Sequence, residues 1–259
     1  MNDTAGKTDA LTRRYFPESH VGGFTRVDGS IEFWSRIAAL IRPDWRVLDF
    51  GAGRGAQIAE DTSDYRRGLK TLKGRVAHVE GCDVDPAVAD NPYLDHGQVI
   101  AMGEPLPYPD SSFDLVVANW VLEHVDAPEA VAAEMARVTK RGGWIAAATA
   151  NRWGYVALAA SIVPNRVHAR TLEKVQPGRK SEDVFPTRYR MNSRRAVKRL
   201  FGRYGEVFAY TGSAEPAYHF GNALIYRLGM IAHKLLPAGL QTALYLFVHR
   251  SDASPEPAA

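Results

Sequence analysis

The chain has 259 residues, of which 46% are hydrophobic and 24% are charged, so it can bury the core of one globular domain, alone or with a cap. Its formal net charge of +3 is too small to indicate a nucleic-acid partner by itself. The single cysteine, Cys82, excludes an intrachain disulfide and favours a reducing compartment. Because Met1 to Asp9 are polar and do not resemble a signal peptide, we expect a cytoplasmic protein.

Helices and strands are predicted to alternate over the first 150 residues. Helical spacing of apolar residues predicts a helix over Ile31 to Ile41, which Pro43 ends. Short apolar runs predict five strands, namely Arg46–Phe50, Ala77–Asp83, Gln98–Ala101, Phe113–Asn119 and Trp144–Thr149. Further helical segments are predicted over Ala56–Glu60 and Pro128–Thr139, with Gly142-Gly143 stopping the second one. This order implies a parallel sheet with helices on both faces.

The pattern changes after Ala150. We expect irregular, partly helical structure over Asn151–Gly178, an ordered loop over Glu182–Arg190, and a basic helix that Ser193 caps and that runs to about Arg203. Two late strands are predicted over Val207–Tyr210 and Ala243–His249, with a helical insert around Asn222–Leu236 between them. These two strands indicate a hairpin-like edge in which one strand is antiparallel to the rest.

The apolar stretch from Phe220 to Val248 is too interrupted to span a membrane. Arg227, His233, Lys234 and Pro237 break it, and no run approaches the roughly 20 apolar residues that a spanning helix needs. A helix that packs on the core is the preferred interpretation, and a weak peripheral membrane contact is the alternative.

Residues Arg46 to Gly55 read RVLDFGAGRG and carry the strongest functional signal. A buried strand ends near Asp49, and Gly51, Gly53 and Gly55 follow at alternate positions before a helix begins. Because glycine lacks a Cβ, the backbone can turn sharply there and approach a ligand closely. A strand, a glycine turn and a helix N-terminus together form a nucleotide-type site.

Two further segments narrow the kind of nucleotide. Asp83 ends the second strand, where a carboxylate can accept hydrogen bonds from both hydroxyls of a ribose; the alternative is a strand-end turn. It lies about thirty residues past the glycine turn, whereas a dinucleotide fold expects roughly twenty. Asp85, before Pro86, is interpreted as a helix cap. The fourth strand runs into Asn119-Trp120-Val121-Leu122-Glu123-His124-Val125, at the sheet edge that faces the ligand crevice.

Five segments occur in order and at suitable spacing: VLDFGAGRG, GCDVDP, LPYPDSSFDLVVAN, VLEHV and ARVTKRGGW. As a set they resemble the class I S-adenosylmethionine-dependent methyltransferases, in the branch of small-molecule enzymes of the type 11 kind. The resemblance covers roughly Arg46 to Thr149. It implies an α/β fold, a Rossmann-like doubly wound sheet of seven mostly parallel strands with the last one antiparallel, plus a helical lid. It also implies S-adenosylmethionine as the cofactor.

The resemblance assigns most of the cofactor-binding residues. It places the turn of Gly51, Ala52 and Gly53 against the methionine part of the cofactor, with Asp49 helping to hold the amino group. Asp83 is expected to bind the ribose hydroxyls.

The remaining assignments concern the two ends of the cofactor. Val84 is expected to pack on adenine, and Asn119 to line the methionine end through its backbone. Met102 stands where the family often has an acidic residue for the adenine amino group. Gly103 and Glu104 follow it, so a backbone carbonyl or the Glu104 carboxylate is expected to serve instead.

Methyl transfer from a sulfonium is an in-line displacement, so the protein mainly aligns the acceptor and removes a proton. His124 is the candidate catalytic base, because an imidazole titrates near neutral pH; a packing role is the alternative. Glu123 is interpreted as a structural or orienting group. Three weaker candidates for the base are Tyr15, His20 and His168.

Four regions are expected, with acceptor specificity outside the shared core. They are an N-terminal helical cap (1–45), a cofactor-binding core (46–150), a substrate-facing lid with the end of the sheet (151–250), and a disordered tail (251–259). Cations outnumber carboxylates from 164 to 203, which favours an anionic glycan or lipid-type acceptor. A solvated basic helix face is the alternative for Arg194 to Arg203.

The acceptor atom is expected to be oxygen, with carbon or another nitrogen as alternatives. Asn119-Trp120-Val121-Leu122 occupies the place where base-amino methyltransferases carry an NPPY-like tetrapeptide, so nucleic acid is not the expected acceptor. No metal site is predicted, because the eight histidines are scattered and there is one cysteine. Two other functions stay open: a nicotinamide-dependent oxidoreductase, and a non-catalytic membrane-surface or scaffold protein.

Overall fold

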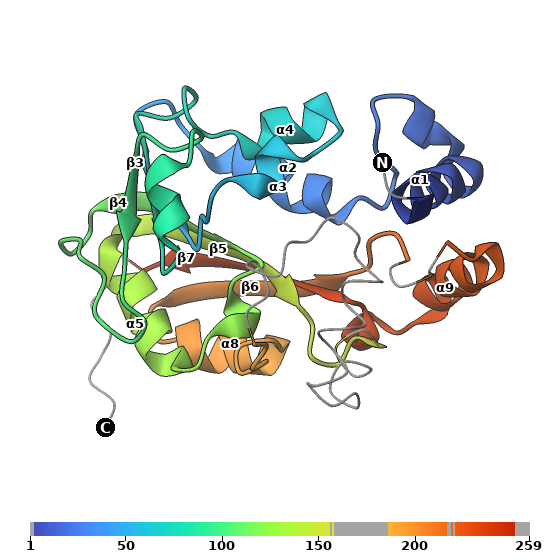
Figure 1. The fold of residues 1–259 in the computed structure, drawn as a ribbon. Coiled ribbons are helices and arrows are strands. Elements are labelled where there is room, and N and C mark those ends of the chain that lie inside the picture. Colours follow the sequence, from blue (N-terminus) through green and yellow to red (C-terminus); the bar gives the residue numbers. More distant parts are fainter. Residues whose placement is uncertain (1–2, 156, 158–185, 217–218, 220, 252–259) are drawn as a thin grey trace.

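A computed structural model describes residues 3–155, 157, 186–216, 219 and 221–251 (Figure 1). Its strands form one seven-stranded sheet in the order β3-β2-β1-β4-β5-β7-β6. In chain order they are β1 (Arg46–Phe50), β2 (His78–Asp83), β3 (His96–Val99), β4 (Phe113–Asn119), β5 (Thr139–Ala150), β6 (Gly205–Gly212) and β7 (Ala243–Arg250). The last strand, β7, lies antiparallel to both β5 and β6, while β1 to β5 pair in parallel. The predicted seven-stranded Rossmann-like fold is therefore confirmed.

Helices cover both faces of the sheet (Figure 1). The α-helices are α1 (Asp3–Tyr15), α2 (Gly29–Leu40), α3 (Ala56–Ala59), α4 (Asp64–Lys70), α5 (Pro128–Val138), α8 (Arg194–Phe201) and α9 (Ala223–Leu235). Short 3-10 turns cover Pro17–His20, Pro86–Asp90, Leu122–His124 and Ala238–Leu240. No helix in the described part of the chain is both long enough and apolar enough to span a bilayer.

Neighbouring residues of the central strands enter two separate cores. Val47 of β1 packs with Phe33 and Ile37 of α2 in one core. Leu48, the next residue, packs in the other core, which includes Met135 of α5 and residues of α8. Because successive strand residues point to opposite faces, an apolar run such as Val47-Leu48 fits a strand that is buried on both sides.

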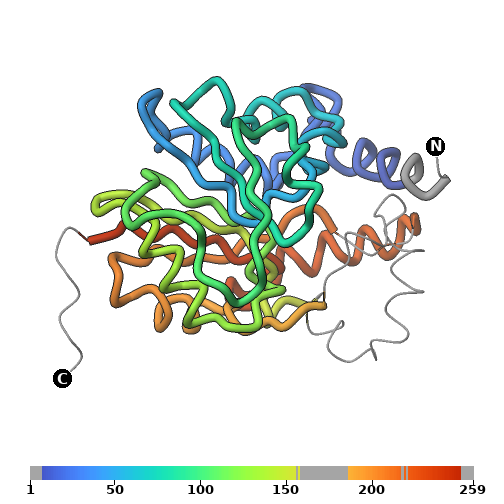
Figure 2. Tube along the Cα trace, turned by 60° about the vertical axis from the view of Figure 1, so that its left-hand side comes forward, coloured from blue at the N-terminus to red at the C-terminus, as the bar shows by residue number. Residues whose placement is uncertain are grey.

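A third, small cluster joins α1 and α9 outside the sheet. Leu11 and Phe16 pack on Tyr226 of α9, and the ring of Tyr15 stacks on the same tyrosine at 5.4 Å between centroids. Figures 1 and 2 show α1 and α9 side by side, and in Figure 1 they lie at the end of the molecule away from β3. The N-terminal helix is thus held by a helix that follows β6 in sequence.

Most predicted boundaries lie within a few residues of the observed ones, but one prediction is wrong. Gly142 and Gly143 do not stop α5, which ends at Val138; they lie inside β5, which starts directly at Thr139. Gly142 has a φ of 71°, and a Cβ on Gly143 would lie 2.7 Å from the carbonyl oxygen of Asp114. The glycines therefore mark an irregular stretch of strand at which the pairing with β4 shifts register.

Smaller corrections concern helix ends and the tail. The first predicted helix begins at Gly29, where the Asp28 side chain caps it, and ends at Leu40 rather than Ile41. The basic helix has Ser193 as its N-cap, as predicted, and ends at Phe201. Residues 252–259 of the predicted tail and 158–185 of the predicted lid lie outside the described residues.

Candidate functional site

Two independent constraints in the glycine turn after β1 require glycine at position 51. Its φ is 79°, a left-handed conformation that favours glycine, and a Cβ there would lie 2.3 Å from Cγ2 of Val121. The backbone amides of Gly51 and Ala52 donate hydrogen bonds to the carbonyl oxygen of Cys82 in β2. The turn is thereby attached to the neighbouring strand and passes directly against the segment that follows β4.

Asp83 lies at the carboxyl end of β2 and faces this turn. Its Oδ2 accepts a hydrogen bond from the Gly53 amide at 2.8 Å, and its Oδ1 accepts one from the Asp85 amide at 2.9 Å. A carboxylate oxygen accepts more than one hydrogen bond, and the side chain is only partly buried, so both oxygens can still serve a ligand. The two amides orient the carboxylate above the glycine turn.

Asp49 is the second acidic group beside the turn. It lies in the central strand β1, paired with Gly81 on one side and Val117 on the other. Burial, with a smaller effect from the negative charge of Asp83, raises the pKa of Asp49 to about 7. A carboxyl group in this state gains most from a positively charged ligand group, because that ligand would stabilise the ionised form.

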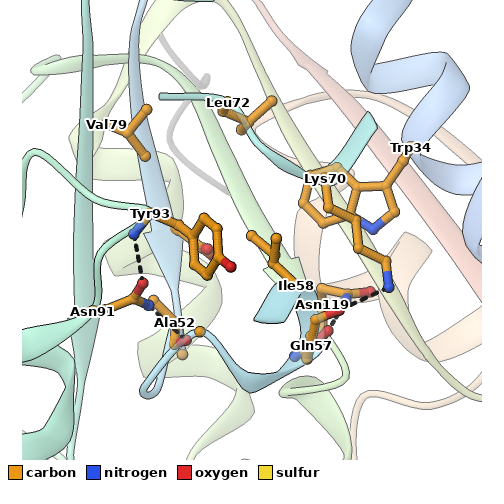
Figure 3. Close-up of a pocket in the computed structure, with 13 residues that line it drawn as sticks. Trp34, Ala52, Gln57, Ile58, Lys70, Leu72, Val79, Asn91, Tyr93 and Asn119 are labelled. Atoms are coloured by element: carbon orange, nitrogen blue, oxygen red, sulfur yellow. Dashed lines mark hydrogen bonds between the residues drawn. The ribbon is translucent and has the colours of Figure 1, made fainter. Parts of the chain in front are cut away.

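A small pocket of about 30 Å³ lies next to Asp49, beside the glycine turn. Figure 3 shows Trp34 and Lys70 on one side of it and Tyr93 on the other. Trp34 is 5% exposed, and its indole Nε1–H has no hydrogen-bond partner in the part of the chain that the structure describes. A buried donor without a partner is uncommon in proteins, so this N–H is available for a ligand group.

Asn119 closes this pocket from the end of β4. Its side-chain amide donates to Oε1 of Gln57 in α3, and the Gln57 amide donates to the Asn119 carbonyl oxygen at 3.4 Å. The next residue, Trp120, has a φ of 58° and is 46% exposed. A positive φ at a bulky residue costs about 1–3 kcal/mol and is typical of functional sites.

A larger cavity of about 330 Å³ lies on the other side of Asn119. Asn119 and Trp120 line it, as do Ala148 at the end of β5 and Tyr245 in β7. The rest of the lining comes from the start of α2, from α4 with the loop before it, and from the segments flanking α9, with Asp28, Gly29, Ser30, Phe33, Asp61, Arg66, Ala214, Glu215, Thr242 and Ala243. This cavity is at the carboxyl ends of the parallel strands, where ligands of open α/β sheets bind.

Two of the three described carboxylates in the cavity, Asp28 and Asp61, form ion pairs, and the third, Glu215, accepts a hydrogen bond from a neutral group. Arg66 binds Asp28 at 2.8 Å and Asp61 at 2.7 Å, and Lys70 also binds Asp61. Burial alone would raise the pKa of Asp61, but the hydrogen bonds from Arg66 and Lys70 lower it to about 2. Glu215 has a different partner: its Oε1 accepts a hydrogen bond from the Thr25 hydroxyl at 2.5 Å. Among the described residues that line the cavity, Glu215 therefore carries the negative charge that a ligand can best compensate.

Comparison with known proteins finds a similarity for the core of the chain. Residues 48–147 match the family model described as a methyltransferase domain. The ubiquinone/menaquinone biosynthesis C-methyltransferase UbiE of Laribacter hongkongensis is 35% identical over 112 residues, which are 40% of this chain and 43% of that protein. The chain thus matches less than half of this relative's length.

Solved structures agree with the fold. A possible histamine N-methyltransferase from Thermotoga maritima gives a TM-score of 0.52 at 16% identity, over 94% of this chain and 98% of that chain. The geranyl diphosphate C-methyltransferase from Streptomyces coelicolor A3(2), solved with Mg²⁺, geranyl diphosphate and S-adenosyl-L-homocysteine, gives 0.50 at 18% identity, over 84% and 77% of the two chains.

Residues 48–147 thus match a methyltransferase domain, and the core of the chain is similar to class I methyltransferases of the type 11 kind. Within this methyltransferase domain, Asp49, Gly51, Ala52, Gly53 and Asp83 lie together at the glycine turn, as predicted from the sequence. Their contacts with a cofactor stay a prediction.

The residues that are predicted to hold adenine are more open. Val84 follows Asp83 and is partly buried, and the Ile100 amide donates to the Asp83 carbonyl oxygen, so the loop after β3 starts beside it. Met102 on that loop is 69% exposed, and Gly103 has a φ of 85° with open space around it. These residues are accessible, and their role in holding adenine stays a prediction.

The predicted base, His124, lies on the 3-10 turn Leu122–His124 and lines neither of the two cavities described above. Its Nδ1 lies 3.1 Å from the carbonyl oxygen of Pro186. Glu123 is buried and accepts a hydrogen bond from the Thr149 hydroxyl at 2.7 Å, which suits the orienting role predicted for it. The catalytic role of His124 stays a prediction.

The weaker candidates for the base occupy other places. Tyr15 stacks on Tyr226 between α1 and α9, and His20 ends the 3-10 turn after α1. His168 and the basic residues between 164 and 185 lie outside the described residues.

Sequence reasoning missed the residues that give the larger cavity its charges. Asp28, Arg66 and Glu215 come from three distant segments, and none of them belongs to a recognisable motif. A signal existed only for Asp28, which precedes Gly29 and Ser30 at the start of a helix and suits an N-cap.

Proposed function

We propose that the chain binds S-adenosylmethionine across the glycine turn and transfers its methyl group to a small molecule in the 330 Å³ cavity. The observation that carries this proposal is the position of Asn119. This residue lines the small pocket beside Asp49 and also the larger cavity. A cofactor that is seated at the glycine turn would therefore have its methionine end next to the space for an acceptor.

The cofactor seat is supported by the chemistry of its donors and acceptors. Asp83 offers two oriented carboxylate oxygens, which suit the two hydroxyls of a ribose. Asp49 offers a carboxyl group whose ionised form a ligand ammonium would stabilise. The buried Trp34 N–H is a donor from which a ligand carboxylate would accept a hydrogen bond. An amino acid end has both an ammonium and a carboxylate. The Streptomyces neighbour was itself solved with S-adenosyl-L-homocysteine.

When bound, S-adenosylmethionine supplies an electrophilic methyl group and carries its own leaving group. The residues of this chain then have three tasks: to hold the cofactor, to place the acceptor in line, and to exclude water. Trp120 lies beside Asn119, and both residues line the cavity. Phe33 and Tyr245 provide further aromatic lining on the acceptor side.

The acceptor class follows from the cavity rather than from the basic stretch of sequence. The Glu215 carboxylate, together with the Trp120 and Tyr245 rings, favours an acceptor with a cationic amine. The described residues of the basic stretch from 164 to 203 do not line the cavity. For example, Arg199 of α8 binds Glu129, and Arg190 donates to the Asp126 carbonyl oxygen. An anionic acceptor, as expected from the sequence, stays an untested prediction.

The atom of the acceptor that receives the methyl group has three candidates: oxygen, carbon and nitrogen. The sequence favours oxygen, whereas the name of the Laribacter relative refers to methylation at carbon. An amine acceptor would favour nitrogen, the other alternative given by the sequence. Product analysis by mass spectrometry after labelled methyl transfer distinguishes the three.

Calorimetry with S-adenosylhomocysteine tests the cofactor half of the proposal. We expect one-to-one binding that Asp83→Asn weakens about ten-fold or more, because one ribose hydroxyl loses a charged acceptor. Asp90→Asn, in the exposed 3-10 turn after β2, is the matched control and should leave the affinity unchanged. Binding of NADH in place of S-adenosylhomocysteine would instead favour an oxidoreductase and contradict the proposal.

A further inference from the structure

Helix α9 carries an apolar face that the rest of the described chain does not cover. Four aliphatic side chains on it are strongly exposed: Leu224 by 66%, Leu228 by 56%, Ile231 by 47% and Leu235 by 76%. At 100° per residue these positions fall within about 60° of one another around the helix, so they form a single stripe along its length. We call this set the α9 stripe.

The α9 stripe lies opposite the face with which the helix packs on the protein. Tyr226 is fully buried in the cluster with α1, and His233 contacts the Tyr155 hydroxyl at 2.9 Å. Both residues are about 180° around the helix from the centre of the stripe. The helix therefore has two apolar faces, one that packs on the protein and one that is exposed. A large exposed apolar patch marks a surface for interaction.

The charges on α9 indicate the kind of partner. The helix contains Arg227 and Lys234, which are both exposed, and it contains no aspartate or glutamate. Both cations fall on the same flank of the stripe, roughly 40–120° from its members. An apolar stripe with cations along its edge and no carboxylates is the composition of helices that lie in the plane of an anionic lipid surface.

We propose that α9 docks the protein on the surface of a membrane that contains anionic lipids. With 13 residues the helix is about 20 Å long, too short for a hydrocarbon core of about 30 Å, so it would lie in the interface. The segments that flank α9 also line the larger cavity, through Glu215 before the helix and Thr242 after it. Docking by α9 would bring this part of the cavity wall close to the lipid surface.

Vesicle sedimentation with the full chain tests this proposal independently of methyl transfer. The probes are vesicles of phosphatidylcholine alone and vesicles of phosphatidylcholine with phosphatidylglycerol. We expect the protein to pellet with the anionic vesicles and to bind the neutral ones more weakly. Leu228→Ser with Ile231→Ser should reduce partitioning about ten-fold or more, because two side chains lose apolar burial in the interface.

Matched variants separate the contributions. Val21→Ser removes a 77% exposed apolar side chain outside α9 and should leave vesicle binding unchanged. Arg227→Gln and Lys234→Gln should each reduce binding to the anionic vesicles about five-fold, and added salt should mimic them. All of these side chains are exposed, so we expect each variant to fold. Binding of S-adenosylhomocysteine checks that it does.

Two results would overturn the proposal. One is that the wild-type protein does not pellet with anionic vesicles, or pellets equally well after Leu228→Ser with Ile231→Ser. The other is a dimer in sedimentation velocity that the same double variant dissociates while vesicles bind neither protein; the α9 stripe would then be covered by a second copy of the chain. Neither result depends on whether the chain transfers methyl groups.

Discussion

Binding of S-adenosylhomocysteine should weaken about ten-fold between about pH 8 and about pH 6, because the cofactor's ammonium needs Asp49 ionised. The pKa of Asp49 is raised to about 7 in the free protein, by burial and by the charge of Asp83. With that pKa, roughly nine-tenths of Asp49 is ionised at about pH 8 and roughly one-tenth at about pH 6. Affinity should rise with pH through this interval and level off above it.

The sign follows from which state binds the proton. An ammonium beside Asp49 lowers the pKa of this carboxyl in the complex, so binding below about pH 7 releases a proton. In the unliganded protein the raised pKa acts in the opposite direction. The ionised form is less favourable in the folded chain than in the unfolded one, so stability declines as pH rises from about 4 to about 7.

Calorimetry in buffers of different ionisation enthalpy measures both the affinity and the released proton. In Asp49→Asn the affinity should be lower at high pH and independent of pH, without proton release. Asp64→Asn is the control, because the Asp64 side chain is 91% exposed on the outside of α4, and it should keep the wild-type profile. The reasoning is refuted if the wild-type affinity is the same at both pH values, or if Asp49→Asn keeps the wild-type pH dependence.

Two other predictions concern the larger cavity. Among probes of similar shape, the cation phenethylamine should be methylated, or should protect the protein thermally, more than 2-phenylethanol or phenylacetate. Glu215→Gln should reduce this preference about ten-fold and leave the affinity for S-adenosylhomocysteine unchanged. A preference for phenylacetate would contradict the proposed acceptor class. Arg66→Ala should cost about 3–5 kcal/mol of folding free energy, because it removes the cation that binds the buried Asp28 and one of the two cations that bind the buried Asp61. Arg36→Ala, in an exposed pair, should cost under about 1 kcal/mol. Chemical denaturation compares these two variants, and equal losses would show that the buried network contributes little.

The sheet was predictable because its strands carry local signals. The fourth strand, Phe113–Asn119, was predicted with its exact limits, since an apolar run bounded by turns needs no tertiary information. The third strand begins at His96, two residues earlier than predicted. His96 pairs with Glu80 of β2, so its strand conformation depends on a partner sixteen residues away.

The donor side of the site was more readable than the acceptor side for a related reason. The glycine turn and Asp83 belong to contiguous motifs, and glycines with left-handed φ leave a mark in the sequence. The charges of the larger cavity depend on Arg66 bridging two elements, and on Glu215 lying beside a strand that follows it in the chain. Ordinary polar residues that are brought together only by folding give no pattern that can be read along the chain. The misread Gly142-Gly143 pair shows the same limit, because β4 decides whether it breaks a helix or bends a strand.

The most direct test of the central claim is a titration of the full chain with S-adenosylhomocysteine by calorimetry. The account predicts one-to-one binding that is strongly weakened by Asp83→Asn and unaffected by Asp90→Asn. A folded protein that binds no S-adenosylhomocysteine at about pH 8, where Asp49 is ionised, would contradict it.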